Sequence, residues 1–404
     1  MLNPRLDLLT DYPFQRLANL LEGPAGDAPL VMSIGEPQHQ PPAFVAEILA
    51  REAAGWGKYP PMGGTPAFRA AVAAWLNRRF RLAPGLIDAD RNILPLAGTR
   101  EGLFQIAQLV ADGKQRTGPD GAPPVVLLPN PFYQVYAGAA LLAGAEPVFV
   151  PAVQEGGFLP DFAAVAEPLL QRTVLAYLCN PGNPQGAVAP AASLGVCLAL
   201  ARRYGFVLAV DECYSEIYDA EPPPSALEVC AAEDDGLANL VVFHSLSKRS
   251  SAPGLRSGFV AGDDRLIGAF SRFRSYGGAA VPLPILAAST ALWQDETHVE
   301  ASRALYRAKF DLADAILGHV PGYYRPAGGF FLWLAVADGE QAARRLWREA
   351  GIRVLPGAYL ARPGADGANP GASYIRIALV HDLATTRRAL TRIAEVLSGR
   401  EVAA

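Results

Sequence analysis

Short apolar runs alternate with segments of helical spacing through the middle of the 404-residue chain. The runs are rich in Val, Leu, Ile and Ala, and helical patterns occupy residues 101–109, 135–142 and 191–203 between them. Continuous apolar strands separated by helices are typical of a parallel sheet covered on both faces. We therefore predict an α/β region with a mainly parallel sheet and strands at residues 92–97, 125–128, 147–150, 174–179, 206–210, 240–243 and 258–261.

The pattern changes after Pro282, where long helical stretches reach residue 317 and short strand-like runs follow at 330–336 and 374–379. This predicts a smaller α+β domain. We place an N-terminal arm that is part of the small domain at 1–45, a large α/β domain at 46–285 and the C-terminal small domain at 286–404. Loops are expected at 23–29, 119–124 and 362–371, which are rich in Pro and Gly. A ligand is expected between the domains, at the carboxyl ends of the central strands.

Composition limits the classes of partner. Apolar residues make up 51% of the chain and charged residues 18%, which is ample for a buried core, and the net charge of -4 offers no basic field for nucleic acid or anionic lipid. The first residues lack the apolar run of a signal peptide and no run is long enough to cross a membrane, so a soluble, cytoplasmic protein is expected. Four dispersed cysteines predict reduced thiols, and scattered histidines predict no metal site.

The segment around Lys248 carries the first candidate chemistry. Ser245, Ser247 and Arg256 lie close to this lysine in the chain, among glycines. A lysine amine can form a Schiff base with a carbonyl compound, while hydroxyls and a guanidinium can hold a phosphate. The combination suggests pyridoxal phosphate, although an ordinary solvated lysine is the simpler interpretation.

A carboxylate and two ring-contact candidates follow other strands. Asp211 directly follows the apolar run 206–210, where it could pair with the protonated ring nitrogen of such a cofactor or simply cap a helix. Tyr214 and Asn183 could donate hydrogen bonds to the ring oxygen, although the Asn-Pro-Gly-Asn-Pro segment by itself also indicates a turn.

Two further segments could contact the same ligand. Thr99 and Arg100 open a helix after the first strand, so their backbone N–H groups could bind phosphate, and Thr99 could equally be a simple N-cap. Tyr133 offers an aromatic face on which a planar ring could stack, or it packs within the protein.

These motifs occur together in an order that resembles the class I/II aminotransferases, which are fold-type I pyridoxal-phosphate enzymes. The resemblance spans nearly the whole chain. It rests on Gly35-Glu-Pro, Lys58-Tyr-Pro, Gly98-Thr-Arg, Pro131-Phe-Tyr-Gln-Val-Tyr, Asn180-Pro-Gly-Asn-Pro, Asp211-Glu-Cys-Tyr, Ser245-Leu-Ser-Lys with Arg256, and Tyr374-Ile-Arg-Ile.

The resemblance implies a role for each matching residue. Lys248 would carry the cofactor, Asp211 would pair with its ring nitrogen, Tyr214 and Asn183 would contact its ring hydroxyl and Tyr133 would stack on it. Arg376 would bind the substrate α-carboxylate, and Gly35 would lie beside the substrate. The phosphate would be held by Ser245, Ser247, Arg256, the backbone at Thr99 and Arg100, and Tyr59 from the neighbouring subunit of a homodimer.

The implied reaction is transamination between an amino donor and a 2-oxo acid. Segments at residues 3–17, 33–39, 98–104 and 328–333 are similar to bacterial succinyldiaminopimelate aminotransferases. That similarity implies the conversion of N-succinyl-2,6-diaminopimelate and 2-oxoglutarate to N-succinyl-2-amino-6-oxopimelate and glutamate, in lysine and diaminopimelate synthesis. Arg100 is a candidate partner for a distal carboxylate. Aspartate or aromatic aminotransferase, C–S β-lyase and a non-catalytic binding protein of the same fold are the alternatives.

Overall fold

The computed structural model describes residues 2–111, 121–230, 236–364 and 366–399. Two of the residues in the predicted loop 119–124, and residue 365 of the loop 362–371, lie outside these ranges. The α-helices are α1 (Pro13–Leu20), α2 (Phe44–Arg51), α3 (Pro66–Phe80), α4 (Thr99–Val110), α5 (Gln134–Leu142), α6 (Glu167–Arg172), α7 (Ala191–Tyr204), α8 (Ala226–Cys230), α9 (Leu246–Arg249), α10 (Asp264–Gly277), α11 (Leu283–Gln294), α12 (Thr297–Leu317), α13 (Gly339–Ala350) and α14 (Leu383–Leu397).

The strands form three sheets. The largest has the order β2-β8-β7-β6-β5-β3-β4, a second has the order β11-β12-β9, and β1 pairs with β10. Their bounds are β1 (Leu30–Val31), β2 (Ile93–Leu96), β3 (Val125–Asn130), β4 (Glu146–Pro151), β5 (Thr173–Cys179), β6 (Val207–Asp211), β7 (Leu240–Ser245), β8 (Gly258–Gly262), β9 (Phe331–Ala335), β10 (Ile352–Arg353), β11 (Leu355–Pro356) and β12 (Tyr374–Ala378).

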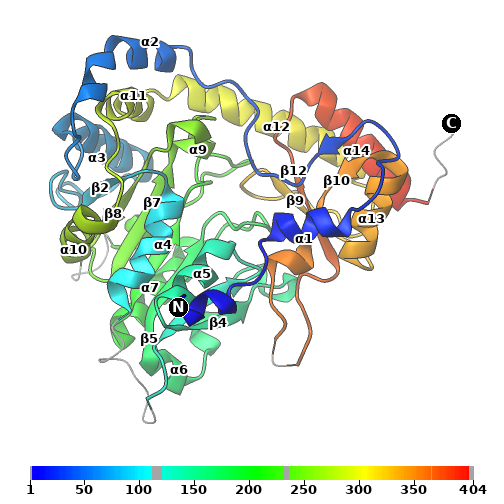
Figure 1. Ribbon diagram of the computed structural model, residues 1–404, viewed down its shortest axis with the longest axis horizontal. Coiled ribbons are helices and arrows are strands. Elements are labelled where there is room, and N and C mark those ends of the chain that lie inside the picture. The colour runs from blue at the N-terminus through cyan, green and yellow to red at the C-terminus, as the bar shows by residue number, and fades with distance from the viewer. Residues whose placement is uncertain (1, 112–120, 231–235, 365, 400–404) are drawn as a thin grey trace.

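The seven-stranded sheet confirms the predicted α/β class (Figure 1). Its strands pair in parallel from β4 to β7, and β8 runs antiparallel to both β7 and β2. Alternate strand residues enter different cores: Leu208 and Val210 pack in the cluster that includes α3, α7 and α11, whereas Val207 and Ala209 pack with α4, α5 and α10. The sheet is therefore covered by helices on both faces, which explains why its strands are apolar throughout.

Helix α12 carries the chain from the large sheet to the three-stranded antiparallel sheet (Figure 1). That sheet packs with α12, α13 and α14 around a separate core that contains Phe310, Leu346 and Ile393. The strand β11 was not predicted because it is only two residues long. The division of the chain at residues 45/46 and 285/286 remains a prediction.

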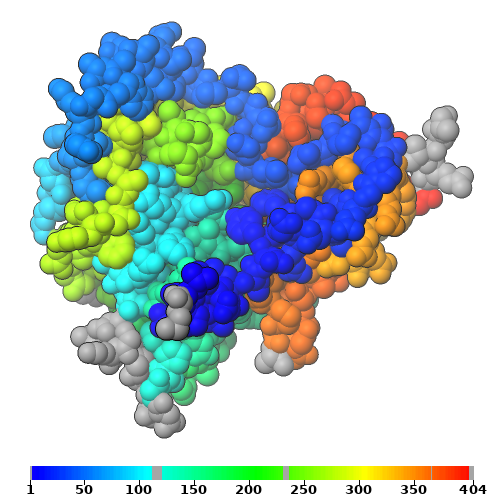
Figure 2. Space-filling model, in the orientation of Figure 1, coloured from blue at the N-terminus to red at the C-terminus, as the bar shows by residue number. Residues whose placement is uncertain are grey.

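Residues 2–40, coloured dark blue, run across the visible face of the molecule (Figure 2). Strand β1 pairs in parallel with β10, and the Met32 N–H donates to the Arg353 carbonyl at 2.9 Å. The 3-10 helix η1 (Pro4–Leu8) instead contacts α5. This segment therefore forms one wall over the carboxyl ends of the central strands.

Three of the four cysteines are buried and all four are free. Within the described ranges, no group of three or more His, Cys, Asp or Glu side chains is placed to hold a metal ion. None of the helices in those ranges combines the length and apolar character that crossing a membrane requires.

Candidate active site

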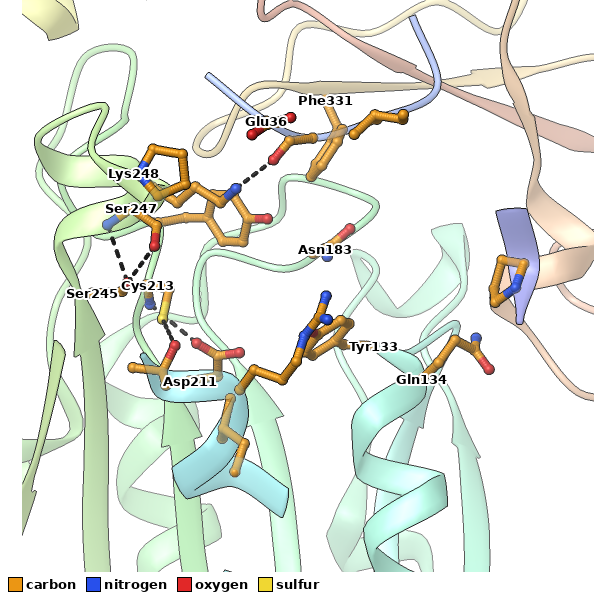
Figure 3. A pocket seen from close by; sticks show the side chains of 18 of the residues that line it. Glu36, Tyr133, Gln134, Asn183, Asp211, Cys213, Ser245, Ser247, Lys248 and Phe331 are labelled. Atoms are coloured by element: carbon orange, nitrogen blue, oxygen red, sulfur yellow. Dashed lines mark hydrogen bonds between the residues drawn. The ribbon is translucent and has the colours of Figure 1, made fainter. Parts of the chain in front are cut away.

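The strand register brings distant segments to one edge of the large sheet. Because β8 is antiparallel to both of its neighbours, β2 and β7 point the same way, and Leu96, Gly258 and Ser245 lie side by side across the three strands. Asp211 lies opposite Cys179 at the ends of β6 and β5. The loops that follow these strands line a cavity of about 510 Å³ (Figure 3).

Twelve of the thirteen predicted site residues line this cavity. They are Gly35, Thr99, Arg100, Tyr133, Asn183, Asp211, Tyr214, Ser245, Ser247, Lys248, Arg256 and Arg376. Tyr59 is the exception: it lies outside the cavity wall and is fully exposed.

Lys248 lies on α9, the short helix that directly follows β7. Its Nζ donates a hydrogen bond to the Gly35 carbonyl and lies 5.2 Å from the centroid of the Phe330 ring. Burial and, to a smaller extent, the positive charge of Arg376 lower the pKa of Lys248 to about 8. Near physiological pH a lysine with this pKa has a much larger neutral fraction than an ordinary lysine, and the neutral amine is the form that attacks a carbonyl carbon.

Asp211 is only 5% exposed at the end of β6. Its Oδ2 accepts a hydrogen bond from the Tyr136 hydroxyl at 2.7 Å, and its Oδ1 accepts one from the Cys213 N–H at 3.2 Å. Burial raises the pKa of the carboxyl, while these hydrogen bonds oppose that rise. A cationic ligand group beside Asp211 would favour its ionised form.

Arg376 lies on the central strand of the small sheet and is also 5% exposed. Its Nη1 donates to Asn183 Oδ1 at 3.0 Å and its Nη2 donates to the Ser33 carbonyl at 2.9 Å. The guanidinium carbon lies 4.1 Å from the centroid of the Phe331 ring. Burial lowers its pKa to about 10, and the buried Nε has no hydrogen-bond partner among the described residues. This guanidinium can therefore accept an anion.

Gly98 and Thr99 at the start of α4, together with Arg256 in the loop before β8, form a group of possible phosphate contacts that we call the cradle. Gly98, with a φ of 89°, caps the helix, so the predicted cap at Thr99 is wrong and Thr99 is the first helical residue. A Cβ atom on Gly98 would lie 2.1 Å from Arg256 Nη2, so only glycine leaves room for that guanidinium. Ser245 Oγ donates to Ser247 Oγ at 3.0 Å beside them. Hydroxyls, a guanidinium and a helix N-terminus are the groups that bind phosphate.

Arg100 and Tyr133 form a pair on the cavity wall. Arg100 Nε donates to the Tyr133 hydroxyl at 2.7 Å. Burial raises the pKa of Tyr133 to about 12, so the tyrosine is neutral at physiological pH. In Figure 3, Tyr133 lies on the other side of Asp211 from Ser245.

Sequence reasoning missed several residues of the site. Tyr136 hydrogen-bonds Asp211, and Cys213 Sγ lies 3.1 Å from Thr99 Oγ1. Tyr136 ends the motif Pro131-Phe-Tyr-Gln-Val-Tyr, and Cys213 lies in Asp211-Glu-Cys-Tyr. Their membership of these motifs could have indicated that they belong to the site. Tyr12 and Phe14 also line the cavity, and no local pattern indicated this.

The donor set fits a phosphate-bearing aromatic aldehyde. Lys248 supplies an amine of lowered pKa for the carbonyl, Asp211 supplies a buried carboxylate for a cationic ring atom, and the cradle around Gly98 supplies phosphate contacts. Arg376 remains available for a carboxylate of a second molecule.

Comparisons with known proteins agree with this chemistry. The family model "Aminotransferase class I and II" matches residues 28–393. An LL-diaminopimelate aminotransferase of Desulforudis audaxviator is 33% identical over 363 residues, which cover 87% of this chain and 88% of the relative. A 4-dedimethylamino-4-oxo-anhydrotetracycline transaminase of Streptomyces rimosus is 34% identical, with 86% and 88% covered.

The structural comparison extends over nearly the full length of the chain. The crystal structure of an aminotransferase from Neisseria meningitidis is 40% identical, superposes with a TM-score of 0.92, and the match covers 98% of this chain and 100% of that one. With the family model matched over most of the chain, this protein belongs to the class I and II aminotransferases and uses pyridoxal 5'-phosphate.

Proposed function

We propose that this aminotransferase transfers the amino group of N-succinyl-2,6-diaminopimelate to 2-oxoglutarate, giving N-succinyl-2-amino-6-oxopimelate and glutamate. The observation that carries the proposal is the convergence of Lys248, Asp211 and Arg376 on one cavity. The relative from Desulforudis audaxviator acts on LL-diaminopimelate by its name, which favours a diaminopimelate donor. It also makes free LL-diaminopimelate the second candidate donor.

When bound, pyridoxal 5'-phosphate supplies a carbonyl group for amino exchange and a ring that accepts electron density from the substrate. We propose that Lys248 holds this cofactor, that Asp211 pairs with its ring nitrogen and that Tyr214 and Asn183 contact its ring hydroxyl. Tyr133 would lie against the ring. Ser245, Ser247, Arg256 and the backbone at Thr99 and Arg100 would hold its phosphate.

Arg376 would orient the substrate through its α-carboxylate, next to Gly35. Orientation matters because it places the α-carbon proton of the substrate within reach of one base. Lys248 would take that proton from the α-carbon and deliver it to the bound cofactor, since its lowered pKa lets it act both as base and as acid near neutral pH. Arg100 would pair with a distal carboxylate of the donor or of 2-oxoglutarate.

A panel of amino donors tests the substrate. The catalytic efficiencies, kcat/KM, for N-succinyl-2,6-diaminopimelate, LL-diaminopimelate, aspartate, an aromatic amino acid and cystathionine should be compared with 2-oxoglutarate as acceptor. The succinylated donor should rank first. A higher efficiency with LL-diaminopimelate would transfer the assignment to the second candidate, and release of a thiol from cystathionine without glutamate formation would indicate a β-lyase.

The substitution Lys248→Ala tests the mechanism. It should abolish transamination and the visible absorbance of lysine-bound cofactor, because no other lysine lines the cavity among the described residues. An unchanged melting temperature would show that the variant is folded. Turnover at the wild-type rate would reject the role of Lys248.

We also propose that the enzyme acts as a homodimer in which Tyr59 contacts the cofactor phosphate of the other subunit. The fully exposed ring of Tyr59 and the half-exposed ring of Trp56, close to it in the chain, support this proposal, since large exposed aromatics mark interaction surfaces. Sedimentation should give a dimer, and Tyr59→Phe should weaken cofactor binding. A monomer with full activity would contradict both statements.

A further inference from the structure

Two arginines lie just outside the cavity, on elements that also supply its wall. Arg16 belongs to α1, and the preceding residues Tyr12, Pro13 and Phe14 line the cavity. Arg362 follows the 3-10 helix η6 (Gly357–Leu360), whose last residue also lines the cavity. Both arginines are therefore close to the wall formed by the N-terminal segment.

Arg362 also forms a hydrogen bond with a residue on the opposite wall of the cavity. Its Nη2 donates to the side chain of Gln134, another cavity-lining residue, at 3.2 Å. Figure 3 shows Gln134 on the far side of the cavity from Lys248. An anion held by Arg362 would accordingly lie at the outer end of the cavity, remote from the reacting amine.

Within the described ranges, neither guanidinium has an ion-pair partner. The side chain of Arg362 donates only to neutral oxygens: Thr10 Oγ1 at 2.5 Å, Gln134 Oε1 at 3.2 Å and the Ala361 carbonyl at 3.0 Å. The Arg16 guanidinium carbon lies 3.9 Å from the centroid of the Tyr359 ring.

The two positive charges also act on each other. Burial lowers the pKa of Arg362, and the charge of Arg16 lowers it further. Two partly buried cations that repel each other and lack a carboxylate form a site that an anion would stabilise.

We propose that Arg16 and Arg362 form an anion subsite that binds the distal carboxylates of the amino donor. This inference rests on the proposed function, and it narrows the substrate class to long amino acids with an anionic distal end. N-succinyl-2,6-diaminopimelate carries two carboxylates at the end remote from the reacting amine. Free LL-diaminopimelate carries one carboxylate and one ammonium group there. Two arginines complement the first charge pattern better than the second.

The test uses ligands that cannot react, so that recognition is measured without turnover. Pimelate and heptanoate have chains of equal length and lack an amine, but only pimelate carries a distal carboxylate. Their dissociation constants should be measured by calorimetry on the holoenzyme, for the wild type, Arg16→Gln and Arg362→Gln. Each variant should weaken pimelate binding by about 10- to 100-fold, the range expected for one charge-assisted hydrogen bond, and leave heptanoate unchanged.

Matched controls separate charge recognition from a structural role. Thr10→Val removes the hydroxyl that Arg362 contacts but keeps the guanidinium, and should leave pimelate affinity unchanged. Arg387→Gln removes an exposed arginine of α14 and should also have no effect. The Arg16 side chain makes no hydrogen bond within the described residues, and its backbone N–H keeps its bond to the Tyr12 carbonyl in the variant, so Arg16→Gln should fold even if Arg362→Gln does not.

Several outcomes would overturn the subsite. These are an equal loss of pimelate and heptanoate affinity, no loss in either arginine variant, or a loss in Thr10→Val as large as that in Arg362→Gln. A donor panel that selects a different amino acid would reject the proposed function while leaving the pimelate comparison intact. The two failures are therefore distinguishable.

Discussion

The hydrogen bond between Tyr136 and Asp211 makes a quantitative prediction. Tyr136 is fully buried, with its ring stacked on Tyr177 at a centroid distance of 4.5 Å, and its hydroxyl lies 2.7 Å from Asp211 Oδ2. In Tyr136→Phe the ring stays and only the hydroxyl is lost. Because the hydroxyl is fully buried, the carboxylate should lose about 2 kcal/mol of stabilisation, the value typical of a hydrogen bond to a charged group.

The effect should depend on pH. Burial already raises the pKa of Asp211, and removal of a hydrogen bond that favours the ionised form should raise it further. Between the ordinary pKa of an aspartate and this raised value, the folded apoprotein binds a proton that the unfolded chain does not. Its stability therefore falls as the pH rises through this window, and it should fall further in the variant.

Thermal unfolding of the apoprotein measures this. At a pH above the raised pKa of Asp211, the melting temperature of Tyr136→Phe should fall by about 4–8 °C, which is the shift that about 2 kcal/mol produces in a domain of 150 to 250 residues. At a pH below that pKa the loss should be about half as large, since only a neutral hydrogen bond is removed. The same substitution in an Asp211→Asn background should also cost about 1 kcal/mol. Equal losses at both pH values, or in both backgrounds, would refute the reasoning.

Three further predictions concern the same cavity. Gly98→Ala should weaken cofactor binding at least about tenfold, because the new methyl group displaces Arg256 from the cradle and the backbone has a φ of 89°. The control Gly195→Ala, on α7 with open space around it, should bind cofactor normally. Equal cofactor affinities of the two variants would contradict the cradle. The rate at which the apoprotein captures pyridoxal 5'-phosphate should rise up to about pH 8 and level off above pH 9, following the neutral form of Lys248, and a rise that continues to pH 10 would indicate an ordinary lysine. Arg100→Ala should raise the KM for 2-oxoglutarate about tenfold, while Tyr133→Phe, which keeps the guanidinium, should not; an unchanged KM in Arg100→Ala would reject its distal-carboxylate role.

Local pattern was enough to predict the large sheet and much of the cavity. The run before Asp211 is apolar on every residue because both faces of β6 are buried, and this made the strand and its carboxyl end visible in the sequence. Parallel strands then bring their ends to one edge, so Asp211 and the Lys248 segment could be assigned to the same place.

Contacts that depend on three-dimensional approach could not be predicted in the same way. Tyr136 reaches Asp211 across 75 positions of the chain, and Arg376 reaches Ser33 across 343. Arg16 and Arg362 come from opposite ends of the sequence, with no motif to link them. Such pairings follow from how the N-terminal segment crosses between the two sheets, which periodicity does not encode.

That crossing segment also determines what a ligand must displace. The Ser33 carbonyl accepts from Arg376, and the Gly35 carbonyl accepts from Lys248, so two backbone carbonyls of this segment engage the side chains proposed to bind the substrate carboxylate and to react with the cofactor carbonyl. Ligand binding therefore exchanges one set of hydrogen-bond partners for another. The measured binding free energy is the difference between the hydrogen bonds formed with the ligand and those lost to the backbone. Substitutions that loosen residues 33–35 could therefore tighten ligand binding, although they remove no group that touches the ligand.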